Sequence, residues 1–566
     1  MSRIVGVGLW LVVGMLAGAC GSNGGNSDAG DGGADAEPDG GDVVPDVDDA
    51  EEAADEAAEE DSGPLPLDLA LGEVVELTAG EGGEFAADLA TPGDDRQFGL
   101  VFYSAAWVTG TLSYELSATG AAASRAGDGA AKAGGPPWDR PGRDFSALEP
   151  ELARALRGGG ARIARDPLPT PVVGDHRDFQ IDDPSAGVVT VDGECIAVGD
   201  DIAAWVDRTT TTPSWSDPDA ATLAEVMAGF DGTVLPRERE YFGDEPDIDT
   251  DGVVNVLWSP IVYELGAMAY FYPCDLFDSG ALPLGCPYSN EQEILYATPP
   301  SMLDPRMARP SSILDTISHE LQHLIYFHHK VSLGGGRGDD NAYILEGWAE
   351  VGEDVSGYGR GIFFIQQAGL QDSDQYGAIE ILRNGGGYDT ARDGMLRGAS
   401  YLFLRYLWDR AGGERVETDG SITDLGSVAW AHETIDSALE GRANFADTVG
   451  APIDDIVFDW YTALLLTGRT DGAGEPLPVE ARFTYLPRVV DAVTGNNRGL
   501  DPYGDFMGMF NLEGAHTVTL ATADGEIPPT GNELVLLEAD GTSPTLSVRV
   551  TGSETAALRV RVARVR

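Results

Sequence analysis

Basic residues are scarce in this 566-residue chain. Its 35 Lys and Arg stand against 95 Asp and Glu, which gives a formal net charge of −60 at pH 7. The only lysines are Lys132 and Lys330, and no Lys or Arg occurs between Arg3 and Arg96. Nucleic-acid binding needs basic surface that neutralises phosphates, so the composition argues strongly against it. An acidic surface fits an extracellular or salt-tolerant protein, but charge alone names no partner.

The N-terminus has an apolar run, residues 4–16, that is too short to cross a bilayer as a mature helix. It follows Arg3 and ends in Ala17-Gly18-Ala19-Cys20, which looks like a bacterial lipoprotein signal. We expect residues 1–19 to be removed and Cys20 to carry the lipid. The alternative is an ordinary secretion signal cut near Ala19. Both predict export, and the first adds a lipid anchor to the cell surface or outer membrane.

Cysteine is also scarce, with four residues in the chain. Apart from Cys20, Cys274 and Cys286 lie close together in a Pro/Gly-rich loop. This pair suits a disulfide in an oxidising compartment. The pairing of Cys195 stays open.

The chain is too long for one compact core, so two or three folded units are expected. Residues 20–62 are mostly Gly, Ala, Asp and Glu and cannot bury a core, which predicts a disordered acidic tether. Strand-like runs separated by Gly-rich turns follow, and the pattern becomes helical from residue 313 to about 465. We therefore predict a small β-domain over 63–118, a low-complexity insert over 119–165, an α+β domain over 166–470 and a C-terminal β-sandwich over 471–566.

A metal-binding pattern lies in the helical part, at His319-Glu320-Leu321-Gln322-His323. Residues four apart share one face of a helix, so both imidazoles can bind one ion. Glu320 then lies beside the metal, where it can take a proton from a zinc-bound water. Apolar residues recur at helical spacing around this pattern, which supports a helix.

A catalytic zinc needs a third protein ligand and one open position. His329 is one candidate, but it lies six residues beyond His323, about 240° around an unbroken helix and off the metal face. Glu346 is the better candidate, because residues 334–336 end the first helix and residues 339–341 can cap a second, antiparallel one. Its setting, Glu346-Gly347-Trp348-Ala349, resembles the gluzincin pattern, in which this motif follows the histidine pair by about twenty residues.

Glu350 lies one helical turn after Glu346. In gluzincins a carboxylate at this place commonly holds the second nitrogen of the first histidine and fixes its tautomer. We therefore expect Glu350 to support His319, and we expect Glu353 and Asp354 to be solvated acids.

Several blocks of sequence together resemble the hyicolysin-type metallopeptidases, a bacterial gluzincin family. The resemblance covers roughly residues 170–465, and its blocks keep a specific order and spacing. They are Phe242-Gly243, residues 247–252, 266–271, 289–290 and 293–296, the zinc helix, Glu346-Gly347 and residues 398–403. The resemblance implies a thermolysin-like catalytic domain, with a β-rich and a helical lobe around a cleft. It also places residues 293–296 near the cleft edge, where an extended peptide can add as a strand.

A peptidase also needs a donor for the oxyanion of its tetrahedral intermediate. Tyr401 is the expected donor, with Tyr388 and His432 as alternatives. Relatives in the family often have Tyr-Gly where this chain has Arg397-Gly398. This difference weakens the assignment of the oxyanion donor by resemblance.

Asp247, Asp249 and Asp251 resemble a calcium loop. An EF-hand needs Glu at the twelfth position, where this chain has Trp258. Calcium binding and a simple turn leading into a strand both stay open.

These features predict a zinc endopeptidase that acts on proteins or peptides, with Glu320 as general base. One alternative is a non-catalytic binding lipoprotein of related fold, which the intact Glu320 disfavours. Another is an aminopeptidase of related fold. It needs a site for the free amino terminus, usually a Gly-x-Met-Glu-Asn strand, and none occurs near Glu293.

Overall fold

The computed structural model describes residues 65–566 apart from 93–94, 109, 123–144, 211–215, 360–361, 507–509 and 553–556. All of them belong to the second of two units, Ser62–Arg566. The predictions for residues 1–62, including the signal, the lipidated Cys20 and the tether, lie outside the described residues. Within the described ranges no helix has the length and apolarity needed to cross a membrane.

A six-stranded mixed sheet is the base of the central domain, in the order β10-β11-β9-β8-β7-β6. The neighbours β8, β9 and β11 run parallel, and β10 at one edge is antiparallel to β11. Every residue of β9 and β11 is buried, as expected of parallel strands covered on both faces. The edge strand is thus β10, whereas the sequence predicts residues 293–296 near the edge. The strands are β6 His176–Asp183, β7 Gly187–Val198, β8 Ile202–Asp207, β9 Val254–Trp258, β10 Ala269–Phe271 and β11 Ile294–Ala297.

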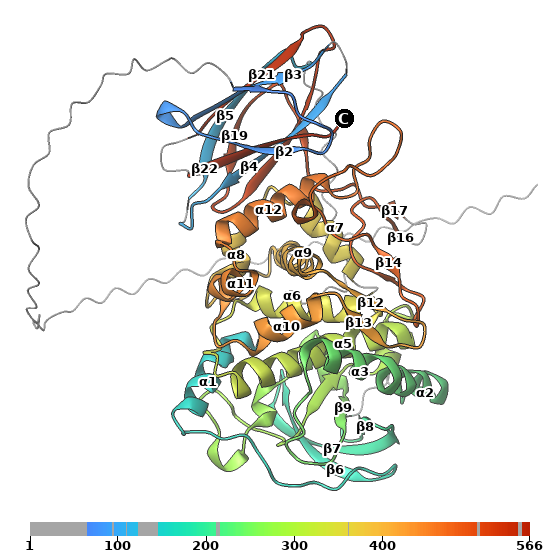
Figure 1. Cartoon of the computed structure of the whole chain (residues 1–566). Helices are drawn as coiled ribbons and strands as arrows, with labels where there is room; N and C mark the ends of the chain where they lie inside the picture. Colours follow the sequence, from blue (N-terminus) through green and yellow to red (C-terminus); the bar gives the residue numbers. More distant parts are fainter. Residues whose placement is uncertain are drawn as a thin grey trace, which may run out of the picture. The chain divides into compact units, whose positions relative to one another are not determined.

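Helices cover this sheet and continue into a helical lobe (Figure 1). The helices are α1 Glu149–Arg157, α2 Ala220–Gly229, α3 Leu235–Phe242, α4 Pro260–Leu265, α5 Pro310–Tyr326, α6 Ala342–Ser356, α7 Ile362–Gln371, α8 Ala378–Leu382, α9 Asp393–Ala411, α10 Ser427–Asp436, α11 Gly441–Val449 and α12 Ile453–Leu466. Short hairpins add β12 Glu414–Val416, β13 Ile422–Asp424, β14 Val489–Val490, β15 Asn497–Arg498, β16 Asp505–Phe506 and β17 Phe510–Asn511. Single helical turns are η1 Glu81–Gly83, η2 Ser146–Leu148, η4 Pro273–Leu276, η5 Ser279–Ala281, η6 Pro300–Met302 and η8 Ala481–Phe483, and the wider π-turns are η3 Phe230–Val234 and η7 Phe327–Leu333.

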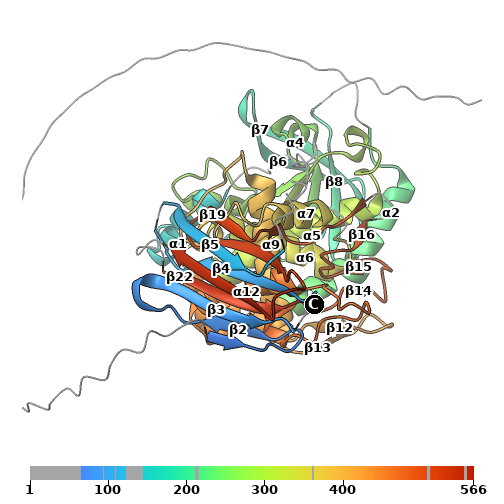
Figure 2. The ribbon, with the colours of Figure 1, turned by 90° about the horizontal axis from the view of Figure 1, so that it is seen from above.

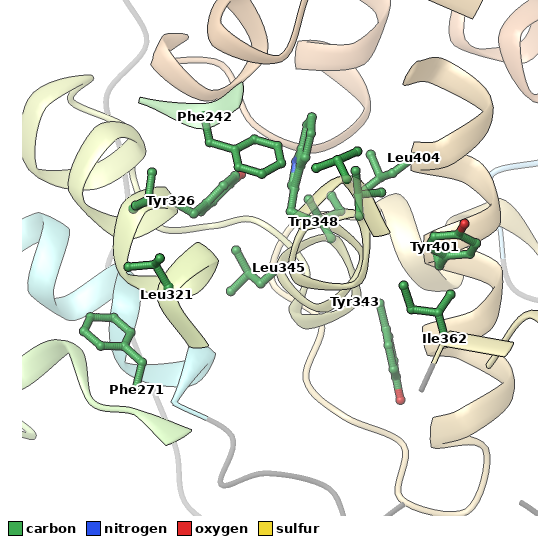
Figure 3. Packing of buried hydrophobic residues seen from close by; sticks show 14 of the residues in the cluster. Phe242, Phe271, Leu321, Tyr326, Tyr343, Leu345, Trp348, Ile362, Tyr401 and Leu404 are labelled. Carbon is green, nitrogen blue, oxygen red and sulfur yellow. The ribbon is translucent and has the colours of Figure 1, made fainter. Parts of the chain in front are cut away.

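Helix α6 lies between α5 and α9 and is buried along its whole length (Figure 3). Leu321 of α5 lies on one side of α6, Trp348 belongs to α6 itself, and Tyr401 of α9 lies on the other side (Figure 3). On its far side α9 meets α7 at glycine, since a Cβ on Gly398 would lie 2.7 Å from the Gly369 nitrogen. Close helix contact of this kind leaves no room for a side chain at Gly398.

Strands from both ends of the chain are combined in the two sheets of one β-sandwich (Figures 1 and 2). Its sheets have the orders β1-β3-β21-β5-β19 and β18-β20-β4-β22-β2. The structure therefore differs from the prediction of an N-terminal β-domain separate from a C-terminal sandwich. The strands are β1 Leu65–Leu67, β2 Val74–Leu77, β3 Glu84–Ala90, β4 Gln97–Ser104, β5 Leu112–Thr119, β18 Val518–Thr519, β19 Thr522–Ile527, β20 Asn532–Glu538, β21 Thr545–Gly552 and β22 Leu558–Arg564.

Two further segments differ from the predicted domain plan. The described end of the predicted insert forms α1 and joins the central domain, where Ile163 makes a β-bridge with Phe277. The described residues of 471–517 precede the sandwich strands, and several of them pack on the helical lobe. There the Tyr485 hydroxyl donates to the Leu402 carbonyl at 2.8 Å, and Asp491 pairs with Arg237 at 2.9 Å.

Candidate metal centre

Helix α5 carries the first part of the predicted zinc site. It begins at Pro310, whose fixed φ suits the first helical position. Its apolar side chains are buried, which turns one face toward the sheet and α6. His319 and His323 occupy the same helix face, and their rings lie 4.8 Å apart.

Helix α6 brings the predicted third ligand to these histidines. Its first turn is capped by Asn341, whose side chain accepts a hydrogen bond from the Tyr343 nitrogen at 3.0 Å. Gly357, with φ 85°, ends the helix in the left-handed conformation. Between these ends Glu346 is buried and faces α5, so the sequence prediction of a converging glutamate agrees with its position.

The two imidazole nitrogens and the two oxygens of the Glu346 carboxylate have a spacing that suits tetrahedral zinc. His319 Nε2 lies 3.2 Å from His323 Nε2 and 3.3 Å from Glu346 Oε2, and His323 Nε2 lies 3.8 Å from Glu346 Oε1. Ligands at 2.0–2.1 Å from a tetrahedral ion are about 3.3 Å apart. Two imidazoles and one carboxylate are also a typical catalytic zinc set, with one position left for water or substrate. The residues present therefore fit a zinc ion.

The carboxylate that orients His319 is Glu353, not Glu350. Glu353 Oε1 lies 2.8 Å from His319 Nδ1, and both side chains are nearly buried. A proton shared at Nδ1 leaves Nε2 free to bind a metal. Glu350 is also buried, but its Oε1 pairs with Arg397 Nη2 at 3.3 Å. The predictions of Glu350 as this support and of Glu353 as a solvated acid therefore differ from the structure.

The surroundings act differently on the three candidate ligands. Burial lowers the pKa of His323 to about 3, so its ring is neutral at pH 7, as a metal ligand must be. Burial raises the pKa of Glu346, but the charges of Arg397 and His319 outweigh this effect and hold it well below its usual range. Burial likewise opposes charge on His319, yet its hydrogen bonds to Glu346 and Glu353 raise its pKa well above the usual value. The carboxylates around His319 thus favour a cation there.

Glu320, the expected general base, lies between the metal ligands and the edge of the sheet. Its Oε2 accepts a hydrogen bond from the Phe271 nitrogen of β10 at 2.9 Å. Burial raises the pKa of Glu320 to about 7. A carboxyl held in this range can both accept and return a proton near neutral pH.

The predicted oxyanion donor Tyr401 does not face the ligands. Its buried hydroxyl donates to Asp354 Oδ2 at 3.1 Å and accepts from Gln366 Nε2 at 3.1 Å. Asp354, predicted to be solvated, is buried there and also pairs with Arg405 at 2.7 Å. Tyr401 is therefore part of the helix packing between α6, α7 and α9.

Tyr388, a weaker alternative by sequence, lies at the centre instead. Its hydroxyl contacts Glu346 Oε1, and the residue is partly exposed. Tyr343 holds the loop in place, because its ring packs edge-on against Tyr388 at 5.6 Å and its hydroxyl accepts from the Asp389 nitrogen at 2.9 Å. Arg397 Nη2 reaches the same centre, in contact with Glu346 and 3.3 Å from His319 Nε2.

The remaining histidine candidates are engaged elsewhere. His329 contacts Asp436 Oδ1 through Nδ1 and the Asp244 carbonyl through Nε2, both at 2.9 Å. His432 Nε2 donates to the Glu240 carbonyl at 3.0 Å. The geometric argument against His329 as a ligand agrees with its position.

The structure joins Cys274 and Cys286 in a disulfide, with Cα atoms 5.7 Å apart. Cys195 is a buried free cysteine in β7. Burial raises the pKa of its thiol to about 11, so it is inert as a nucleophile near neutral pH.

Comparison with known proteins gives one informative similarity. A segment of 109 residues is 33% identical to the neutral metalloprotease ShpI of Staphylococcus hyicus, and covers 18% of this chain and 23% of that protein. The match thus spans less than a quarter of the relative. No family model matches the chain.

Solved structures of an M1 zinc metallopeptidase from Deinococcus radiodurans are more distant. The enzyme is 16% identical over 50% of this chain and 51% of its own, with a TM-score of 0.25. A point variant of it is 13% identical over 50% and 52%, with a TM-score of 0.28. The chain has a mixed α/β fold with several sheets, and its two-histidine, one-glutamate centre together with the ShpI segment supports the class of zinc metallopeptidases.

Proposed function

We propose that the chain is a zinc-dependent endopeptidase with a thermolysin-like catalytic domain, which hydrolyses peptide bonds of extracellular proteins. One observation carries the proposal. The imidazole nitrogens of His319 and His323 lie 3.2 Å apart, and each has an oxygen of the Glu346 carboxylate at 3.3–3.8 Å, beside a buried Glu320 that is held at the edge of a sheet. Ligands, base and strand edge are the parts that metal-assisted peptide hydrolysis requires.

In the proposed mechanism, each side chain of the centre has a separate role in hydrolysis. Zinc held by the three ligands would supply a Lewis acid for the scissile carbonyl and make a water acidic enough to lose a proton near pH 7. Glu320 takes that proton and passes it to the leaving amine. Tyr388 donates its hydroxyl to the carbonyl oxygen as negative charge develops there. Glu353 holds His319, and Arg397 holds the Glu346 carboxylate, so the ligand geometry is preorganised.

The edge strand β10 offers backbone groups for an extended peptide. Along an antiparallel pair, successive residues point their N–H and C=O groups alternately toward and away from the partner strand. The Phe271 nitrogen points to Glu320, away from β11, so the groups of Ala269 also lie on the open edge. A substrate can pair there as an added strand, with its scissile bond near the metal.

The same strand favours an endopeptidase over an aminopeptidase. Residues 266–270 read Gly-Ala-Met-Ala-Tyr. Ala269 stands where the aminopeptidase strand Gly-x-Met-Glu-Asn has the glutamate that holds a free amino terminus. An alanine cannot bind an ammonium group, so this position supports cleavage within a chain. The intact Glu320 again disfavours a purely binding protein.

We also propose that the protein is exported and lipid-anchored through Cys20. The signal-like sequence of residues 1–20 supports this proposal, and so does the Cys274–Cys286 disulfide, which suits an oxidising compartment. Cys20→Ala should abolish labelling by a fatty-acid analogue and release the protein from the membrane fraction. Retention of label in that variant would disprove lipidation at this residue.

The test of the enzymatic proposal compares zinc content and casein hydrolysis in wild type and Glu320→Ala. Both proteins should hold about one zinc per chain, and the variant should lose nearly all activity. Glu264→Ala, which removes an exposed glutamate, is the matched control and should behave as wild type. A wild-type protein that is fully loaded with zinc yet cleaves no peptide would contradict the proposal.

A further inference from the structure

A second group of carboxylates gathers at the ends of two neighbouring parallel strands. Asp247 and Asp249 lie in the loop that leads into β9, and Glu293 directly precedes β11. The register of these strands, Ile294 beside Asn255, brings the loop and Glu293 together. One oxygen from each of the three carboxylates lies within 4.8 Å of the other two. Residues almost fifty positions apart thus share one small volume.

Two of these carboxylates are buried and have oxygens without partners. Asp249 is 0% exposed and Glu293 is 1% exposed. Within the described part of the chain, neither Asp249 Oδ2 nor Glu293 Oε2 has a hydrogen-bond partner. Buried polar atoms are rarely left in this state, because desolvation without a partner costs free energy. Each unpartnered oxygen belongs to a carboxylate of the group, and a cation between them would satisfy both.

The other oxygens are held by backbone amides, which fixes the carboxylates in place. The Ile248 nitrogen donates to Glu293 Oε1, and the Asp251 nitrogen donates to Asp249 Oδ1 at 3.1 Å. Asp247 is exposed and receives a long hydrogen bond of 3.4 Å from the Gly252 nitrogen. Two buried oxygens are therefore preoriented, and an exposed side remains for water.

Asp251 differs from this group although the sequence places it in the calcium-like loop. Its Oδ2 lies 3.6 Å from Arg177 Nη1 and 3.4 Å from Asn255 Nδ2, and its Oδ1 accepts from the Val253 nitrogen at 3.0 Å. Its charge is already compensated within the protein. The structure thus replaces the predicted set Asp247, Asp249 and Asp251 with one that contains Glu293.

We propose that Asp247, Asp249 and Glu293 bind a calcium ion that fastens the start of β9 to the start of β11. All three ligands are oxygens, which hard cations prefer and zinc in catalytic sites does not require. A spread of up to 4.8 Å fits oxygens around an ion at 2.3–2.6 Å, and water on the Asp247 side can complete six to eight ligands. Because β11 pairs with β10, the ion would stabilise the sheet whose edge strand contacts Glu320.

The experiment uses the full chain after dialysis against EGTA, with thermal unfolding followed as CaCl₂ is added in 100 mM KCl. The wild type should gain about 5 °C at a calcium concentration near a hundred times Kd. Glu293→Gln should gain almost nothing. Asp200→Asn, which removes one exposed charge from the turn between β7 and β8, is the matched control and should respond as wild type. The control separates the site from diffuse ion binding to a chain of net charge −60.

Two further variants make the outcome decisive. His323→Ala removes a proposed zinc ligand and should keep the full calcium response, so failure of the zinc proposal leaves this one untouched. Asp247→Asn changes an exposed residue and keeps its size, and it should weaken calcium affinity at least tenfold in isothermal titration. An unresponsive wild type, or an equal response in Glu293→Gln, would overturn the inference. Loss of the response in His323→Ala would assign the calcium effect to the zinc centre instead.

Discussion

Replacement of Glu353 tests how the structure supports the proposed zinc ligand His319. The buried Glu353 carboxylate lies 2.8 Å from His319 Nδ1 and fixes both the ring orientation and the tautomer. Loss of such a partner typically lowers metal affinity about 10–100-fold, which is about 1.4–2.8 kcal/mol. Glu353→Gln keeps an oxygen acceptor and loses only the charge, so we expect the lower end of this range. Glu353→Ala removes both and should reach the upper end.

Glu350→Gln is the matched control, since it makes the same change one helical turn earlier. Glu350 pairs with Arg397 at 3.3 Å rather than with His319, so its replacement should lower zinc affinity much less than tenfold. The assay is competition for zinc against a fluorescent chelator at one fixed pH, with circular dichroism to verify folding. If Glu350→Gln weakens zinc binding more than Glu353→Gln does, the assignment of the supporting carboxylate is wrong.

Other replacements test the remaining parts of the centre and the fold. Tyr388→Phe should lower kcat for a peptide substrate about 10²–10³-fold at unchanged zinc content. Tyr401→Phe should leave kcat unchanged and cost about 1–3 kcal/mol of stability in urea unfolding. A large loss of kcat in Tyr401→Phe but not in Tyr388→Phe would restore Tyr401 as the oxyanion donor. Gly398→Ala should destabilise the protein by about 1–3 kcal/mol through the crowded contact of α7 with α9, seen as a lower Tm, and an unchanged Tm would show that the helices can separate freely. Burial raises the pKa of Glu533 from 4.5 to about 7. Since the folded pKa lies above the unfolded one, the stability linked to this group is complete below pH 4.5 and is lost as the pH rises through 7. In urea unfolding, Glu533→Gln should thus raise the free energy of unfolding by about 1–3 kcal/mol at pH 8 and leave it unchanged at pH 4. The control Glu115→Gln changes an exposed residue and should leave the stability unchanged at both pH values. An equal gain for Glu533→Gln at both pH values would refute the linkage.

The convergence of the three candidate ligands could be predicted from sequence because helical spacing encodes it. His319 and His323 lie four residues apart, so any helix through them presents both rings on one face. Glu346 follows after glycines and a capping asparagine, which indicate a turn and a second helix. These signals are local. Tertiary packing then brings the histidine face of α5 against the Glu346 face of α6.

The supporting residues depended on information that spacing alone lacks. Glu346, Glu350 and Glu353 all lie near one face of α6, at separations of four and seven residues. The axial position of α6 relative to α5 decides which of these carboxylates contacts His319. The sequence does not specify that position. The seven-residue spacing of Glu346 and Glu353 is the signal that could have raised Glu353 as a candidate. Tyr388 lies in a loop. Loop residues have no regular periodicity, so the direction of its side chain could not be predicted from the sequence.

The β-sandwich shows the same limit on a larger scale. Individual strands were predictable from alternating apolar residues, as in β5, where buried and exposed residues alternate. Their partners were not, because β21 pairs with β3 through Thr545 beside Ala90, residues more than 450 positions apart. Pairing over such distances is set by the closure of the whole core, and the sequence of either strand fits many partners.

The most direct test of the central claim is cleavage of a peptide that is acetylated at its N-terminus and amidated at its C-terminus. Zinc-loaded wild type and Glu320→Ala, matched for zinc content, are incubated with this peptide, and the products are identified by mass spectrometry. The zinc endopeptidase account predicts internal fragments with wild type and an intact peptide with Glu320→Ala. An intact peptide with both proteins, or equal cleavage by both, would contradict it.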